Sequence, residues 1–314
     1  MCTPTTAGVV AGEWRGGIAH FRGVPYARPP VGALRFGSPR PPVPWDGVRP
    51  ATGFGPVFVQ SGHFGPGAED ALYANVWTPD IRGDRPVLVY IHGGGWKVGA
   101  GSLADHDGSR LARRGDLVVV TFNYRLGAFG FGLHEEFADE RTGSPANWGL
   151  QDQVALLGWA QDNAGAFGGD PDNITLAGTS AGGASAYQLA RLPEVRRIVR
   201  RIVPISASHA WAPADSTTPE DCRLVYRTIA DRLGTTIPGL REVPTAVLHK
   251  AWETVFSGDP RTRIVASGRE YRGPVLDGEW MTDFDYRAPG SGLPILSVHT
   301  TTEGSFYTGP GSPQ

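Results

Sequence analysis

The pattern of hydrophobic positions changes at about residue 72 of the chain. The first 60 residues carry short alternating runs, such as Gly17 to Phe21, which predict small antiparallel strands. Nearly continuous apolar runs at 86–91 and 117–122 indicate strands that are covered on both faces. Further strands are predicted at 72–77, 174–177, 202–206 and 293–298. This pattern predicts a mostly parallel central sheet with a small N-terminal antiparallel piece.

Helical patterns lie between these strands. Apolar residues recur at helical spacing over 147–160, which predicts a helix. The Gly and Pro residues at 165–171 that follow are expected to break regular structure there. Residues 182–191 form a predicted helix directly after a strand, and Thr218-Pro219 opens another with a capping hydroxyl and a proline at the first helical position. Alternating strands and helices indicate an α/β fold, which we interpret as one domain over residues 1–314.

Charge and composition exclude several classes of protein. Lys and Arg number 29 and Asp and Glu 31, so the net charge is −2. The chain also has no run of five like charges, so a nucleic-acid binder is not expected. We expect no membrane partner either, because no stretch of 18 apolar residues occurs. The two cysteines, Cys2 and Cys222, are too few for a disulfide framework or a metal cluster. A cytoplasmic protein without a metal site is the expectation.

The strongest chemical signal is the pentapeptide Gly178-Thr179-Ser180-Ala181-Gly182, which has the form G-x-S-x-G. It lies between a predicted strand and a predicted helix, which is the context of a nucleophile elbow. In such a turn the serine Oγ projects above the sheet, and the N-terminus of the following helix favours developing negative charge. A glycine-rich turn that carries a serine by chance is the alternative reading.

A second signal, His92-Gly93-Gly94-Gly95-Trp96, directly follows the apolar run at 86–91. Consecutive glycines at the end of a strand allow two backbone N–H groups to point at one spot, as an oxyanion hole requires. Taken alone, the run is also compatible with a plain flexible turn.

With their neighbours, these segments resemble the type-B carboxylesterase and cholinesterase family of α/β-hydrolases. The resemblance covers most of residues 15–206 in the family's order and spacing, and it is weak over 207–270. The matching segments are Phe21 to Ala27, Pro29 to Gly32, Arg35-Phe36, Glu69 to Val76, Asn123 to Gly130, Asn147 to Gln153 and Ala166 to Pro171. The resemblance implies the α/β-hydrolase fold and the hydrolysis of small carboxylic esters without a cofactor.

The resemblance also assigns roles to individual residues. Ser180 is the expected nucleophile and carrier of an acyl-enzyme. The backbone N–H groups of Gly94, Gly95 and Ala181 are the expected oxyanion donors. Glu303, in a Glu-Gly pair after the last predicted strand, is the expected acid of the catalytic triad.

Charged residues elsewhere follow the family's structural pattern. Two pairs, Arg35 with Glu69 and Arg125 with Asp152, are expected to be structural ion pairs of the scaffold.

At two positions the sequence has an uncharged residue in place of the one that the family usually has. Thr179 stands where the family usually has a glutamate, so a preference for cationic alcohol groups should weaken and uncharged esters are the expected substrates. Ala71 replaces the cysteine of a family disulfide, which agrees with an intracellular chain.

A third departure concerns the catalytic histidine, which in this family follows the acid by about a hundred residues. The eight histidines, at 20, 63, 92, 106, 134, 209, 249 and 299, all precede Glu303. His209 and His299 each follow a predicted strand, so either is a candidate substitute base. His92 is expected to be structural.

Two alternative functions remain open at this stage. One is a catalytically inactive or truncated α/β-hydrolase that serves as a binding protein, and the other is a biosynthetic relative that transfers acyl groups without hydrolysis. The chain is interpreted as shortened at its C-terminus, which predicts an exposed sheet edge through which it could associate with itself.

Overall fold

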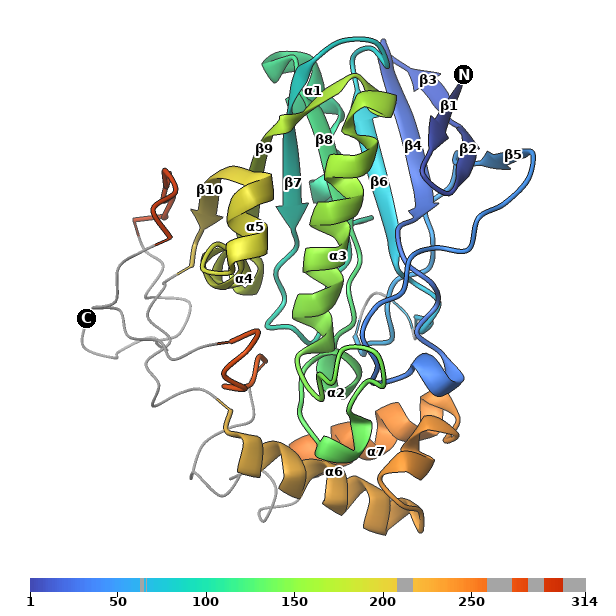
Figure 1. Ribbon diagram of the computed structural model, residues 1–314, viewed down its shortest axis with the longest axis vertical. Helices are drawn as coiled ribbons and strands as arrows, with labels where there is room; N and C mark the ends of the chain where they lie inside the picture. The colour runs from blue at the N-terminus through green and yellow to red at the C-terminus, as the bar shows by residue number, and fades with distance from the viewer. Residues whose placement is uncertain (63–64, 66, 208–216, 259–272, 282–290, 302–314) are drawn as a thin grey trace.

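Two β-sheets organise the structure, a computed structural model that describes residues 1–62, 65, 67–207, 217–258, 273–281 and 291–301 (Figure 1). Across the central sheet the strands are β10 (Val199–Ile205), β9 (Gly169–Thr179), β7 (Arg85–Ile91), β8 (Val118–Phe122), β6 (Tyr73–Thr78), β4 (Ile18–Pro25) and β3 (Glu13–Arg15). The smaller sheet contains β1 (Cys2–Thr5), β2 (Gly8–Ala11) and β5 (Val48–Pro50).

Strand direction divides the central sheet into two halves. Strands β10, β9, β7 and β8 are parallel neighbours, as the continuous apolar runs predicted. Strands β6, β4 and β3 join them in antiparallel pairs, so the sheet is mixed rather than mostly parallel. The N-terminal antiparallel piece predicted from sequence comprises the β1–β2 pair together with β3 and β4 of the large sheet, and β6 adds a further antiparallel strand.

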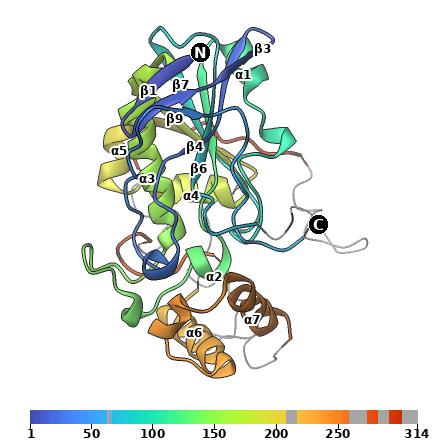
Figure 2. The same cartoon turned by 90° about the vertical axis from the view of Figure 1, so that its right-hand side faces the viewer.

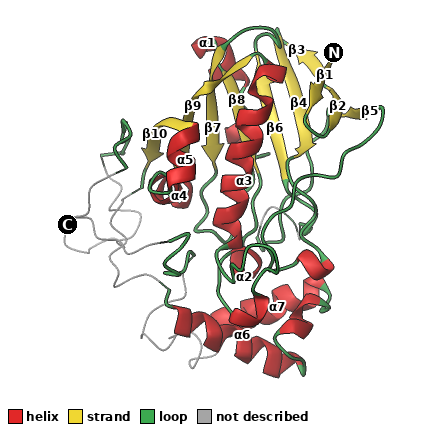
Figure 3. Ribbon diagram, viewed as in Figure 1, coloured by secondary structure: helices red, strands yellow, loops and turns green. Residues whose placement is uncertain are grey.

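Helices cover both faces of the sheet and one of its ends (Figures 2 and 3). The side view shows α3 and α5 on one face and α1 on the other, with α6 and α7 beyond the end to which β7 and β10 point. The α-helices are α1 (Ser109–Gly115), α2 (Gly127–Gly130), α3 (Trp148–Asn163), α4 (Ala181–Leu189), α5 (Pro193–Ile198), α6 (Pro219–Leu233) and α7 (Thr245–Gly258). None of the helices in the described ranges is both long and apolar enough to span a bilayer.

Two sequence predictions can be checked at element boundaries. Helix α6 begins as predicted, since the Thr218 side chain accepts the Asp221 N–H and the Asp221 carboxylate accepts the Thr218 N–H, both at 3.1 Å. The break predicted over 165–171 is wrong in its second half, because β9 already starts at Gly169, which pairs with Arg85. A register shift in the ladder accommodates Pro171 there.

Both predicted ion pairs are confirmed, and each is buried. Arg35 binds Glu69 through Nε and Nη2, at 2.9 and 2.5 Å. Its Nη1 donates to the carbonyl oxygens of Leu240 and Val243, at 2.9 and 2.6 Å. This arginine therefore fastens the segment between α6 and α7 to the N-terminal part of the chain.

The predicted last strand lies beside β10. Isolated parallel bridges join Ile202 to Ile295 and Ile205 to Val298, so residues 294–298 extend the sheet by one strand position. The Ser206 N–H donates to the Val298 carbonyl at 2.8 Å. Ile295, Leu296 and Val298 are exposed, by 48, 63 and 41 %. The edge thus carries an apolar surface in the described residues, as expected.

Candidate active site

Ser180 occupies a strained turn between β9 and α4. Its backbone has φ 55° and ψ −121°, in the left-handed half of conformational space that side chains rarely adopt. The surroundings hold it there, because the Ser180 N–H donates to the Ile205 carbonyl at 2.8 Å and the Ser180 carbonyl accepts the Ala184 N–H at 2.9 Å. Ser180 is partly exposed, and Ala181 is the first residue of α4. The predicted strand–turn–helix context of the pentapeptide is confirmed.

The last glycine of the pentapeptide is required by close packing. A Cβ atom on Gly182 would lie 2.2 Å from the Ile91 carbonyl oxygen and 2.7 Å from that of His92. Because both obstacles are backbone atoms at the end of β7, no side chain can yield to make room. Helix α4 therefore lies directly against the strand that leads into the glycine run.

The register of the parallel strands brings the glycine run beside Ser180. Ile91 of β7 pairs with Gly178 of β9, so two residues later Gly93 arrives at the level of Ser180. A Cβ atom built on Gly93 would be 3.3 Å from the Ser180 Cβ. Gly94 and Gly95 follow and are exposed. The structure thus brings together the expected nucleophile and the glycine run that carries the expected oxyanion donors, which we call the donor loop.

Trp96 fixes the far side of this loop. Its indole Nε1 donates to the hydroxyl of Ser185 in α4 at 3.0 Å, and its carbonyl accepts the Gly127 N–H at 2.8 Å. Both Trp96 and Ser185 are buried. The helix that begins at Ser180 and the glycine loop are therefore bound to each other by a buried hydrogen bond.

Thr179, the residue before the serine, has a neutral partner. The Tyr90 hydroxyl donates to the Thr179 Oγ1 at 2.9 Å. Burial raises the pKa of Tyr90, so this phenol stays protonated at neutral pH. The position that the family fills with a carboxylate thus holds an uncharged hydrogen-bonded pair.

The other predicted catalytic residues lie at the same sheet edge or outside the described residues. Glu303 and His209 both lie outside them. His299 follows Val298, two strand positions from β9, and is exposed, with its Nε2 2.7 Å from the Ser297 hydroxyl. The described residues provide no hydrogen-bond partner for the Ser180 hydroxyl. The triad therefore stays a prediction.

Comparison with known proteins gives the family. The sequence profile of the carboxylesterase family matches residues 3–308. This chain belongs to the carboxylesterase family. It is 35 % identical to the para-nitrobenzyl esterase of Bacillus subtilis (strain 168) over 325 residues, covering 98 % of this chain and 64 % of that protein. It is 40 % identical to the phenmedipham hydrolase of Pseudarthrobacter oxydans over 268 residues, covering 81 % of this chain and 50 % of the relative.

Solved structures agree with this membership. A PNB esterase superposes with a TM-score of 0.85 at 33 % identity, over 100 % of this chain and 66 % of that one. The α/β-hydrolase fold expected from the sequence is therefore confirmed. The chain spans less than two thirds of the length of each of these relatives.

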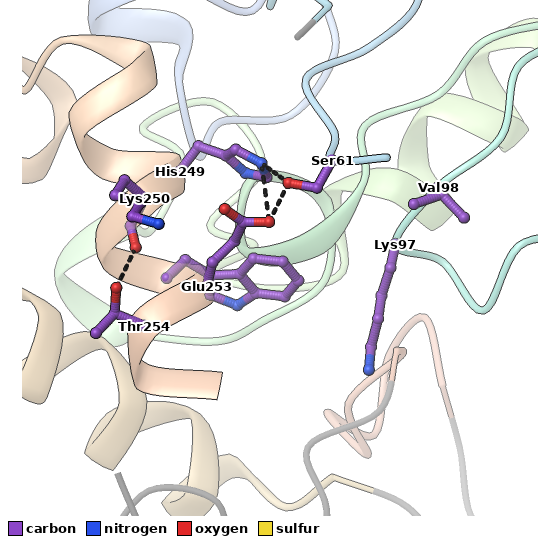
Figure 4. Close-up of a pocket in the computed structure, with 8 residues that line it drawn as sticks. Ser61, Lys97, Val98, His249, Lys250, Glu253 and Thr254 are labelled. Atoms are coloured by element: carbon purple, nitrogen blue, oxygen red, sulfur yellow. Dashed lines mark hydrogen bonds and ion pairs between the residues drawn. The ribbon is translucent and has the colours of Figure 1, made fainter. Parts of the chain in front are cut away.

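A second serine of the carboxylesterase chain also lies beside a histidine and a carboxylate (Figure 4). Ser61, His249 and Glu253 line a cavity of about 440 Å³, and Lys97 lies across from them. The Ser61 hydroxyl donates to Glu253 and lies 3.0 Å from His249 Nε2, while Glu253 Oε1 is 3.6 Å from that same nitrogen. A catalytic triad needs the carboxylate on the opposite ring nitrogen. This cluster therefore lacks the geometry of a proton relay.

His92, which the sequence analysis interpreted as structural, is buried under the glycine loop of the carboxylesterase chain. Its Nδ1 lies 2.9 Å from the Gly93 carbonyl oxygen, and its ring stacks on Tyr124 at 4.3 Å. Within the described part of the chain its Nε2 has no hydrogen-bond partner. Burial lowers the pKa of His92 to about 4, because a charged ring there would lose its hydration.

This shift predicts an acid-sensitive fold. The folded state binds the His92 proton more weakly than the unfolded state, whose pKa is about 6.5, so stability is full above pH 6.5 and falls as the pH is lowered towards 4. The difference between these two pKa values corresponds to a loss of roughly 3 kcal/mol at most. Urea unfolding from pH 7 to 4.5 should show a steeper loss in the native protein than in His92→Phe, which keeps an aromatic ring on Tyr124. Equal slopes would contradict the assignment.

Two contacts of the site escaped the sequence analysis. Tyr90 and Ser185 are polar residues within apolar elements, and their partners lie 89 positions away along the chain. No local motif marks either residue. The only signal was that each interrupts an apolar stretch that is otherwise expected to be buried.

Proposed function

We propose that this chain carries the nucleophile and the oxyanion donors of a serine carboxylesterase that hydrolyses uncharged carboxylic esters. The observation that supports it most is the strained backbone of Ser180 at the start of α4, with Gly93 packed against it. A strained serine is retained where surrounding structure enforces it, and such strain concentrates at functional sites. Membership in the carboxylesterase family supports the same chemistry.

In the proposed reaction the Ser180 Oγ attacks the carbonyl carbon of the ester and passes its proton to a base. The carbonyl oxygen becomes an oxyanion, which accepts hydrogen bonds from the N–H groups of Gly94, Gly95 and Ala181. When the tetrahedral intermediate collapses, the alcohol leaves with the proton and the acyl group stays on Ser180. A water molecule then attacks the acyl-enzyme, releasing the acid and restoring the serine.

The remaining triad members are proposed from the sequence. Glu303 would orient a histidine, which would act as the general base and then as the general acid. His209 and His299 are the two candidates for this base within the chain. The position of His299 at the carboxyl edge, beside β10, supports its candidacy.

The substrate class is proposed from the neutral surroundings of the serine. The Tyr90–Thr179 pair puts no charge next to Ser180, so a cationic group on the substrate gains no attraction there. Two relatives, named a para-nitrobenzyl esterase and a phenmedipham hydrolase, act on small molecules, which supports a small-molecule ester.

The test of this proposal is covalent labelling with a fluorophosphonate. Such a reagent phosphonylates activated serines, so mass spectrometry should find about one equivalent per chain, on the peptide that contains Ser180. Ser61 serves as the internal control, because it also lies near a histidine. Labelling at Ser61, or none at Ser180, would refute the proposed mechanism.

We also propose a cytoplasmic location and self-association at the edge formed by residues 294–298. Neither Cys2 nor Cys222 forms a disulfide in the described part of the chain, which supports a reducing compartment. Exposed Ile295 and Leu296 support association of the edges. Cell fractionation tests the location, and sedimentation velocity over a range of concentrations tests the self-association.

A further inference from the structure

The loop that follows β7 is tied down at its far end by side chains from other elements. The Gly101 N–H donates to Asn123 Oδ1 at 2.9 Å, and its carbonyl accepts the Thr121 hydroxyl at 2.6 Å. Two residues earlier, Gly99 is tied by Gln60. Between these anchors and the end of β7, only Gly94 and Gly95 are exposed. The exposed proposed oxyanion donors therefore lie between the end of β7 and these anchors.

Gln60 holds both polar groups of the Gly99 backbone. Its Nε2 donates to the Gly99 carbonyl at 2.9 Å, and its Oε1 accepts the Gly99 N–H at 2.8 Å. The same Nε2 donates to the Phe58 carbonyl at 2.9 Å, which fixes the rotamer of the glutamine. Gln60 is 1 % exposed, so water cannot replace these bonds.

Gly99 transmits this restraint towards the serine. Its φ of 114° is a conformation that favours glycine, and a Cβ atom there would be 2.5 Å from both the Gly93 carbonyl oxygen and His92 Nδ1. Gly99 thus packs directly against the peptide that leads into the donor loop. Gly93 in turn lies against Ser180. A displacement of Gly99 would have to move this peptide or open a gap beside it.

Gln60 is the anchor on the catalytic side of the loop. Asn123 and Thr121 bind Gly101, which lies further from the donors along the chain. The Lys97 and Val98 N–H groups both bind the Gly94 carbonyl at 3.1 Å, so the tight turn of the donors ends one residue before Gly99. Figure 4 shows Ser61 and Val98, the neighbours of Gln60 and Gly99 in sequence, on two separate segments of the chain.

We propose that Gln60 is a positioning residue of the reaction, which sets the geometry of the oxyanion donors by fixing Gly99. The expected effect of Gln60 on turnover rests on the proposed function. Its expected effect on the loop does not depend on that function. Preorganised donors stabilise a transition state only while they stay in place, and a misplacement of about 1 Å can lower the rate by roughly a hundredfold. Because Gln60 is 1 % exposed, we expect it to act through Gly99 and not by contacting the ester.

The experiment compares Gln60→Leu with Gln153→Leu in the full chain. Gln153 of α3 is also fully buried, but within the described residues its amide makes no hydrogen bond, so the same substitution there controls for general loss of polarity. For Gln60→Leu we expect kcat on p-nitrophenyl acetate to fall by roughly 10- to 100-fold, with KM changed less than about threefold. Hydrogen exchange of the Lys97, Val98 and Gly99 amides should accelerate at least about tenfold, since their hydrogen bonds depend on the fixed loop. Gln153→Leu should change neither measurement.

A Ser180→Ala variant measured alongside separates the two proposals. Turnover that survives without Ser180 refutes the proposed function, and the exchange rates then test Gln60 alone. Unchanged exchange in Gln60→Leu, equal losses in both leucine variants, or faster exchange with unchanged Ser180-dependent turnover would each overturn the role of Gln60.

Discussion

Replacing Ser180 with alanine is expected to lower kcat for short-chain p-nitrophenyl esters by about 10⁴-fold or more, to the level of the residual catalysis that other groups supply. The reason is that the Ser180 Oγ is the proposed carrier of the acyl group at this turn. Ser180 lies at the N-terminus of α4 with the exposed Gly94 and Gly95 nearby, and an alanine there keeps the backbone but removes the attacking oxygen. Initial rates of p-nitrophenolate release by the purified variants measure the effect.

Ser61→Ala is the matched control for this measurement. Ser61 also contacts a histidine and a glutamate, so a hydrolase that used that cluster would lose its activity instead. The shared contact of Ser61 and Glu253 with one ring nitrogen of His249 argues against such a relay. We therefore expect Ser61→Ala to keep its rate within about threefold. A rate that follows Ser61 rather than Ser180 would reverse the assignment of the nucleophile.

The sequence predicts those parts of the fold that depend on local pattern. The strands at 86–91 and 117–122 were predictable from continuous apolar runs. Strand β8 is buried on both faces, whereas β7 is buried on one face and mostly half-buried on the other. The antiparallel pairing of β6 with β8 was not predicted, since the alternating run at 72–77 does not by itself give the direction of the strand. Helix α7 was overlooked, although its buried Leu248, Trp252 and Val255 are spaced as on one face of a helix.

The candidate site divides in the same way. Ser180 and the glycine run could be predicted because each belongs to a motif of contiguous residues. The parallel register of β7 and β9 then brings the two motifs together. Gln60 could not, because it acts on Gly99 across 39 positions and a single buried glutamine has no periodic signal. The contacts that fix a site in place depend on tertiary structure, whereas the reacting group and its turn are local.

A buried ion pair fixes the α3 side of the fold. Arg125 and Asp152 are 1 and 0 % exposed in their side chains, and Asp152 accepts both Nε and Nη2 of the arginine, at 2.8 and 2.7 Å. Arg125 also donates to the carbonyl oxygens of Gly37 and Trp148, at 2.7 and 3.2 Å. The guanidinium therefore links three segments of the chain, and its charge has one carboxylate to balance it in this network.

Asp152→Ala is accordingly expected to lower the free energy of unfolding by about 3–5 kcal/mol, because it leaves the guanidinium of Arg125 buried without its counter-charge. Glu135→Ala provides the contrast, since Glu135 pairs with Arg223 at the surface, with side chains 56 and 38 % exposed, and should lose no more than about 1 kcal/mol. Urea unfolding at pH 7, analysed for midpoint and slope, gives both values. Replacing the buried pair together, as Arg125→Met with Asp152→Leu, should recover much of the loss, because neither charge is then stranded. If Asp152→Ala lowered the free energy of unfolding as little as Glu135→Ala, the Arg125–Asp152 pair would have to be hydrated in solution. That result would contradict its role in holding α3 against the sheet.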